Sequence, residues 1–92
     1  MNIKLKIEIT RENKIIFNND VVVQMEENKT CKDLKEWYKT RYPIYSEPHI
    51  KNIKIKNGDV EIGDNEVLTE NMKLKFFGEL NFSQNEKLIK QD

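Results

Sequence analysis

The chain has 92 residues, with 16 basic and 16 acidic side chains and therefore no formal net charge at pH 7. This length fits one domain with one small core and is too short for most self-contained cofactor enzymes. No apolar run approaches the roughly 20 residues of a membrane-spanning helix, and the balanced charge removes the simplest argument for nucleic-acid binding.

Cysteine usage indicates the cellular compartment, and composition affects how the lysines are interpreted. The single cysteine, Cys31, excludes an intramolecular disulfide framework and predicts a reducing, intracellular compartment, with the cytoplasm favoured. The first residues alternate from the third position onward, which is not the pattern of a signal peptide. The chain has 14 Lys, 11 Asn, 11 Ile and no Ala. This bias is typical of AT-rich coding sequence, so a lysine cluster carries less functional weight here than usual.

Two strands are predicted at the start of the chain. Over residues 3–10 four apolar residues alternate with polar ones, which is the pattern of a half-buried strand. Residues 11–14 are polar and predict a turn. A second strand region is predicted over 15–26, but the polar segment Asn18-Asn19-Asp20 interrupts it. That segment is either a bulge in one long strand, which we favour, or the hairpin turn itself, in which case the first strand would extend through Phe17.

One helix is predicted, about 12 residues long, after this strand pair. Thr30 suits the N-cap position, and Asp33 follows three residues later, near the positive end of the helix. Pro43 ends the helix at about residue 42. The stripe expected to face the core consists of Cys31, Leu34 and Tyr38.

The chain then returns to strand patterns. Residues 43–49 form a loop with two prolines, and alternation resumes over 50–56. Asn57-Gly58 is the strongest hairpin signal in the chain and leads into a short strand at 60–62.

A last strand and a polar segment complete the pattern. The strand is predicted over 72–77, where apolar residues again alternate with lysines. Residues 78–92 are polar and predict a disordered tail or a short docking helix. The apolar residues of this tail are Leu80, Phe82, Leu88 and Ile89.

The order of elements is an α+β pattern, and over residues 1–77 it resembles the ubiquitin-like β-grasp family. The segments that carry the resemblance are the alternating start at 3–10, the helix opened by Thr30, the hairpin at 53–58, Leu68-Thr69, and the strand with Met72, Leu74 and Phe76. The resemblance implies a ubiquitin-like β-grasp domain over residues 1–77, with a mixed sheet of four to five strands packed on one helix. Residues 78–92 would form a C-terminal extension.

The same resemblance implies a range of functions. Proteins of this family act as protein-binding modules, as covalent modifiers or as sulfur carriers. Modifiers and sulfur carriers end in Gly-Gly, because their C-terminal carboxylate is adenylated and must reach a partner's active site. This sequence contains no Gly-Gly pair. The resemblance therefore implies a non-conjugating member, with a modifier or sulfur carrier as the disfavoured alternative.

In the implied arrangement the first strand is central, with the last strand beside it and the strand at 53–56 next. The outward lysines of these three strands then share one face: Lys4, Lys6, Lys54, Lys56, Lys73 and Lys75. One interpretation is a docking face for an acidic partner surface. The other is a solvated face that also discourages edge aggregation. Nucleic acid is disfavoured as a partner because stacking aromatics and arginines are scarce near these lysines.

We therefore predict a non-catalytic protein-interaction module, a small adaptor or structural subunit of a larger assembly, with no cofactor and no metal. The predicted binding residues beyond the lysines are Phe77, Trp37, Leu80 and Phe82. Trp37 either packs at the edge of the sheet or stays exposed as an interface anchor. His49 and Cys31 lack the neighbours of a metal or catalytic site, and no phosphate loop, nucleophile elbow or carboxylate pair is present.

Overall fold

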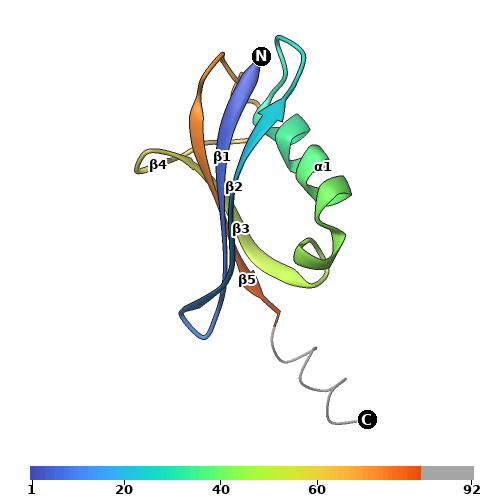
Figure 1. Ribbon diagram of the computed structural model, residues 1–92, viewed down its shortest axis with the longest axis vertical. Helices are drawn as coiled ribbons and strands as arrows, with labels where there is room; N and C mark the ends of the chain where they lie inside the picture. The colour runs from blue at the N-terminus through green and yellow to red at the C-terminus, as the bar shows by residue number, and fades with distance from the viewer. Residues whose placement is uncertain (82–92) are drawn as a thin grey trace.

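The computed structural model describes residues 1–81, which form a mixed sheet with one α-helix against one of its faces (Figure 1). The elements in chain order are β1 (Asn2–Arg11), β2 (Lys14–Gln24), α1 (Cys31–Arg41), the 3₁₀ turn η1 (Pro43–Tyr45), β3 (Ile50–Asn57), β4 (Val60–Glu61) and β5 (Lys73–Leu80). The five strands lie in the order β2-β1-β5-β3-β4. The predicted interior position of the first strand, with the last strand beside it and the strand at 53–56 next, is therefore confirmed. Strands β1 and β5 are parallel, and the other pairs are antiparallel.

The β1–β2 hairpin settles the alternatives left open for the second strand. The turn lies at Glu12 and Asn13, which both have positive φ angles, of 51° and 66°. Strand β2 is continuous through Asn18-Asn19-Asp20, so placing the hairpin turn there is wrong and one long strand is confirmed. The expected position of the bulge is also wrong: the extra residue is Ile16, between the pairs Ile9–Phe17 and Thr10–Ile15. The polar segment keeps its register because β2 is an edge strand, where polar side chains remain in water.

The first turn of α1 is held by the chain around it. Thr30 is the N-cap, as predicted, and both its N–H and its hydroxyl donate to a carboxylate oxygen of Asp33, at 2.9 and 3.1 Å. The N–H groups of Cys31 and Lys32 have no partner within a helix, and they donate to the carbonyls of Glu66 and Asp64, at 2.9 and 3.1 Å. The segment after β4 therefore caps the helix with its own backbone.

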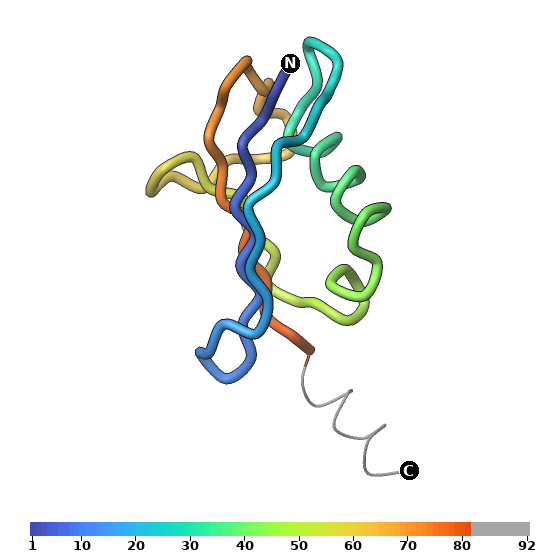
Figure 2. Tube along the Cα trace, viewed as in Figure 1, coloured from blue at the N-terminus to red at the C-terminus, as the bar shows by residue number. Residues whose placement is uncertain are grey.

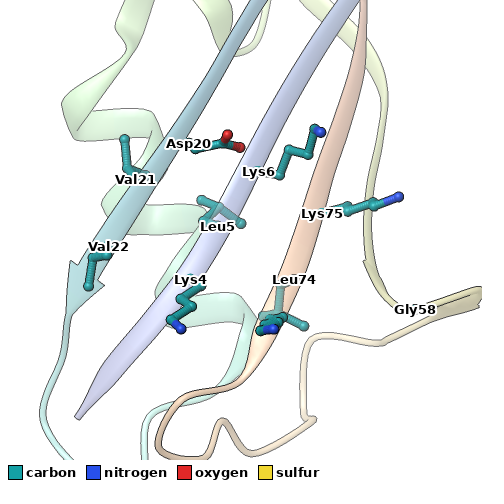
Figure 3. A pocket seen from close by; sticks show the side chains of 10 residues that line it. Lys4, Leu5, Lys6, Asp20, Val21, Val22, Gly58, Leu74 and Lys75 are labelled. Atoms are coloured by element: carbon teal, nitrogen blue, oxygen red, sulfur yellow. The ribbon is translucent and has the colours of Figure 1, made fainter.

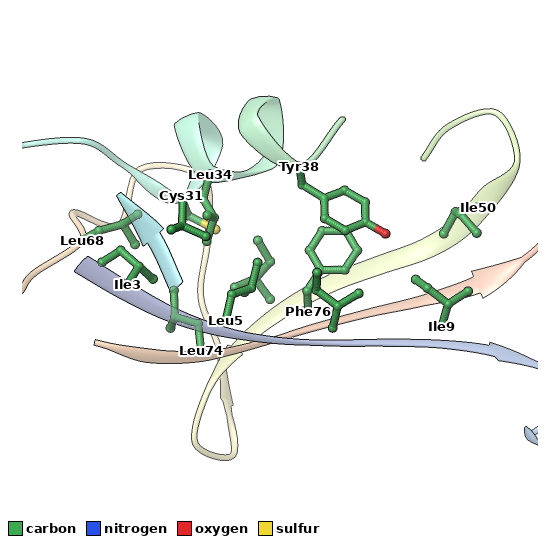
Figure 4. Packing of buried hydrophobic residues seen from close by; sticks show 13 residues of the cluster. Ile3, Leu5, Ile9, Cys31, Leu34, Tyr38, Ile50, Leu68, Leu74 and Phe76 are labelled. Carbon is green, nitrogen blue, oxygen red and sulfur yellow. The ribbon is translucent and has the colours of Figure 1, made fainter. Parts of the chain in front are cut away.

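The core lies between α1 and the inner face of the sheet (Figure 4). Tyr38 and Phe76 bridge the two layers: their rings stack with centroids 3.8 Å apart, and the Tyr38 hydroxyl donates to the Tyr45 carbonyl at 2.8 Å. Burial raises the pKa of the Tyr38 hydroxyl well above its usual range. Most of the rest of the core consists of the alternating residues expected for the strands and the helix: Ile3, Leu5, Ile7, Ile9, Val23, Cys31, Leu34, Ile55 and Leu74. Leu68 joins it from the segment after β4, and Ile50 faces inward because the register of β3 shifts between Lys51 and Lys54.

Strand β5 is longer than predicted, because it continues past Phe77 through Leu80. Gly78 is buried, and a Cβ atom there would lie 2.5 Å from the Cγ2 atom of Ile50. This glycine therefore allows β5 and β3 to pack closely, and the predicted tail begins in structure with three residues of strand. Residues 82–92, with Phe82, Leu88 and Ile89, lie outside the described residues.

The projecting parts of the sheet lie at its hairpins. In Figure 2 the β1–β2 hairpin extends beyond the helical layer, and the β3–β4 turn projects away from α1. Strand β4 is shorter than the predicted 60–62, but the N–H of Ile62 still donates to the Ile55 carbonyl at 2.9 Å. Among residues 1–81 no helix is long and apolar enough to cross a membrane.

Replacing Gly78 with alanine is expected to lower the free energy of unfolding by about 1–3 kcal/mol, because the new methyl group would overlap a branched, buried side chain. Urea denaturation measures this change. The matched control is Gly63→Ala, where nothing lies within 4 Å of the added Cβ and a change within about 0.5 kcal/mol is expected. Equal stability of both variants would contradict the close packing of β5 against β3.

The Asp33 carboxylate is expected to make stability depend on pH. Hydrogen bonds from Thr30 hold the pKa of this carboxyl below its usual value of about 3.8. A lowered pKa contributes stability above the unfolded value and loses it as the pH falls through the folded value. Asp33→Asn should therefore lower Tm at pH 7, and the difference from the unsubstituted protein should shrink below about pH 4. Asp59→Asn, in the exposed β3–β4 turn, is the control, and a difference that persists at pH 2–3 would contradict this account.

Candidate functional site

All six predicted lysines lie on the face of the sheet that points away from α1, and we call them the lysine face. Each alternates along its strand with inward-facing core residues. Lys4 of β1 lies opposite Lys73 of β5. The next row places Lys6, Lys75 and Lys56 side by side across three strands. The lysine face is Lys4, Lys6, Lys54, Lys56, Lys73 and Lys75, and Figure 3 views part of it with the helix behind the sheet.

The charges of the lysine face are not neutralised within the described residues. Among residues 1–81, none of the six ammonium groups lies within 4.0 Å of a carboxylate. The longest row is flanked by two acids, since Asp20 is opposite Lys6 and Glu61 is opposite Lys56. Like charges opposite one another on a sheet oppose folding by up to about 1 kcal/mol per pair. The face therefore keeps an unpaired positive charge that an acidic surface would neutralise.

The lysine face encloses a hollow of about 470 Å³. Lysines of β1 and β5 line it, the side chain of Val22 of β2 borders one side, and Gly58 of the β3–β4 turn reaches the other (Figure 3). Val22 is 61% exposed, so this side offers apolar surface to a ligand. The hollow thus combines positive charge with an exposed aliphatic side chain. The contribution of β2 and Gly58 was missed from the sequence, although the strand register would have placed Val22 opposite Lys4.

Phe77 joins the lysine face, as predicted, and its ring is in contact with one of the lysines. It lies between Glu8 of β1 and Lys54 of β3 in the third row of the sheet. The Lys56 ammonium group lies over the ring, 5.5 Å from its centroid. This cation–π contact occupies one face of the ring, and a nucleic-acid base would have to displace it to stack there.

The other predicted binding residues lie elsewhere. Trp37 is on α1, in the opposite layer, where it is half-buried and makes an edge-to-face contact with Tyr42 at 6.1 Å. Leu80 alternates with Glu79 and packs against the core cluster on the inner side of the sheet. Phe82 is outside the described residues. The structure thus brings the six lysines and Phe77 together and places Trp37 and Leu80 on the other side.

A second hollow, of about 360 Å³, lies between α1 and β3. Its floor reaches Tyr38 and Phe76, and its rim carries charges of both signs, including a 2.7 Å ion pair between Lys35 and Asp64. That ion pair lowers the pKa of Asp64. The mixed rim gives this hollow no single electrostatic preference, unlike the lysine face.

The residues considered for catalysis or metal binding are placed as follows. Cys31 is fully buried, and burial raises the pKa of its thiol, which opposes formation of the nucleophilic thiolate. His49 is exposed in the loop before β3. Among residues 1–81, no group of three or more His, Cys, Asp or Glu side chains is arranged to hold a metal ion.

Comparisons with protein-family models, curated proteins and solved structures find no match to this chain. Function is therefore inferred from the residues of the site and their chemistry.

Replacing Lys75, the middle lysine of the longest row, is expected to stabilise the fold. Lys75→Gln removes two like-charge contacts and should raise the free energy of unfolding by up to about 1 kcal/mol at low salt. In 1 M salt, where charges are screened within about 3 Å, the gain should largely disappear. Thermal unfolding at both salt concentrations measures it, with Lys32→Gln on the exposed side of α1 as the control. A gain that is independent of salt would argue against charge repulsion.

Proposed function

We propose that this chain is a non-catalytic protein-interaction module of the ubiquitin-like β-grasp type, acting as a small adaptor or structural subunit of a larger assembly. The strand order β2-β1-β5-β3-β4, with one helix on one face, is compatible with that fold. The observation that carries the proposal is the lysine face, where three lysines adjoin in one row without a carboxylate partner within the described residues.

The chemistry of this face supports an acidic protein surface as the partner. A positive face steers an acidic partner during diffusional encounter and gives the contact a fixed orientation. The hollow adds the exposed aliphatic side chain of Val22, which would contact an apolar side chain flanked by carboxylates. Lysine side chains contribute here twice, since their methylene stems cover apolar surface while their ammonium groups remain at the rim.

The alternative of a nucleic-acid partner has weaker support. Phosphate groups would also neutralise the lysines, but among residues 1–81 Phe77 is the one aromatic residue placed on the lysine face, and Lys56 occupies one face of its ring. Arginine, which reads bases with a bidentate fork, is absent from the lysine face. A protein partner needs neither feature.

The proposal is tested by capture from a native cell extract with the double variant Lys73→Glu plus Lys75→Glu. This variant should lose a salt-sensitive partner, because it reverses two charges at the centre of the lysine face. It should not lose stability, since each new carboxylate lies opposite a lysine. The control is Lys32→Glu plus Lys39→Glu, which changes the net charge equally but on exposed positions of α1.

Three results distinguish the possibilities. Capture that is lost with the sheet variant and kept with the helix variant, after nuclease treatment, supports a protein partner at the lysine face. Capture that nuclease abolishes supports the nucleic-acid alternative. Equal capture by both variants would show that the lysine face does not carry the interaction.

A further inference from the structure

Strand β2 forms one edge of the sheet and has a symmetrical distribution of polar and apolar residues. Over its 11 residues one polar residue is followed by three apolar, three polar and three apolar residues, and then by one polar residue. The centre of this pattern is Asn19. The segments are Lys14, Ile15-Ile16-Phe17, Asn18-Asn19-Asp20, Val21-Val22-Val23 and Gln24.

This edge also exposes apolar side chains that the fold does not use. Ile15, Ile16 and Val22 are 53%, 42% and 61% exposed. Among residues 1–81, β2 has a neighbouring strand on one side only, so its outer backbone groups are available for another strand. The opposite edge of the sheet is different, because β4 pairs with only two residues of β3, and the rest of β3 exposes Lys51, Asn52 and Lys54 and is irregular at Asn52, which has a positive φ angle. A long edge with exposed aliphatic residues is the part of this surface best suited to strand pairing.

We propose that β2 pairs in antiparallel fashion with β2 of a second copy of this chain, around a two-fold axis at Asn19. This register places Ile16 opposite Val22 and Phe17 opposite Val21, each pair occurring twice because the contact is isologous. Asn18 lies opposite Asp20, where its amide can donate to the carboxylate. All apolar residues of the strand then face apolar residues, and no two charges of the same sign meet.

Neighbouring registers lack this match. Moving the axis to Asn18 places Lys14 opposite Val22 and Asp20 opposite Ile16. Moving it to Asp20 places two Asp20 carboxylates opposite each other, which is unfavourable in an antiparallel pair. The bulge at Ile16 lies outside Phe17–Val21, so the central five residues can pair regularly, and the Ile16–Val22 pairs adjoin this regular segment at both ends. The pattern therefore selects one partner, a second copy, and one register.

The contact would join the two sheets edge to edge. Because it is isologous, it would form a closed dimer and would not continue into a longer assembly. Paired residues of one register share a face, so both lysine faces would lie on one side and both helices on the other. The two hollows would then flank the seam, since Val21 and Val22 belong both to β2 and to the hollow. The pairing itself does not depend on the proposed function.

Sedimentation velocity of the full chain from about 1 μM to about 1 mM tests the proposal. A monomer–dimer equilibrium is expected. Val22→Glu should weaken dimerisation at least about tenfold, because it places a carboxylate opposite an isoleucine at two positions. Val60→Glu is the matched control, since Val60 is 66% exposed on the opposite edge and this variant should dimerise normally.

The register is tested by mixing Val22→Glu with Ile16→Lys, two variants that should each dimerise poorly. The mixture should form a heterodimer, in which the new glutamate and lysine lie opposite each other. If Val22→Glu instead strengthens dimerisation, it lies opposite Lys14 and the proposed register is wrong. A protein that stays monomeric over the whole range, or a dimer that Val22→Glu leaves unchanged, would overturn the proposal.

Discussion

One helix covers only one face of the sheet, and the rest of the structure follows from this constraint. The inner face packs against α1 through the stacked rings of Tyr38 and Phe76 and becomes the core. The outer face has no second layer within the described residues and must be compatible with water. Lysine meets this requirement at six positions, but parallel pairing of β1 with β5 sets some of those charges directly opposite one another. The charge density of the outer face is thus a product of the strand register, even though the whole chain is neutral.

Much of this arrangement was predictable, and the failures have physical causes. The alternation of residues 3–10 predicted β1 because one face of that strand is buried and the other is not. The helix start was predictable because Thr30 and Asp33 make a local contact. The position of the bulge was not, since the outer side of an edge strand contacts water and its residues carry no burial pattern. From sequence alone Gly78 is expected to end the strand. Its actual role is to leave room for the side chain of Ile50, which is distant in the chain, so this role could not be predicted.

The candidate site, like the fold, was predictable only in part. The six lysines could be assigned to one face from alternation and an expected strand order, and the structure places them there. The hollow could not be predicted, because it depends on the twist of the sheet and on the position of the β3–β4 turn. The alternation of polar and apolar residues encodes neither. Trp37 belongs to α1 and therefore lies in the other layer. It is beside the buried stripe of the helix, so its side chain is only half-buried. Leu80 lies an even number of residues after Leu74 and Phe76, so in one continuous strand it faces inward as they do. This could be predicted only if β5 was expected to continue past Gly78.

The pairing of β1 with β5 also determines when this chain can fold during its synthesis. Residues paired across these two strands are about 70 positions apart, and β5 separates β1 from β3 in the sheet. A chain that extends only through β1, β2 and α1 contains a hairpin and a helix, but the edge of β1 that faces β5 still lacks its neighbour. Contacts between such distant residues form slowly, because a long loop must close first. The inner edge of β1 therefore stays unpaired until β5 has been synthesised, and an unpaired strand edge makes an incomplete chain prone to aggregation.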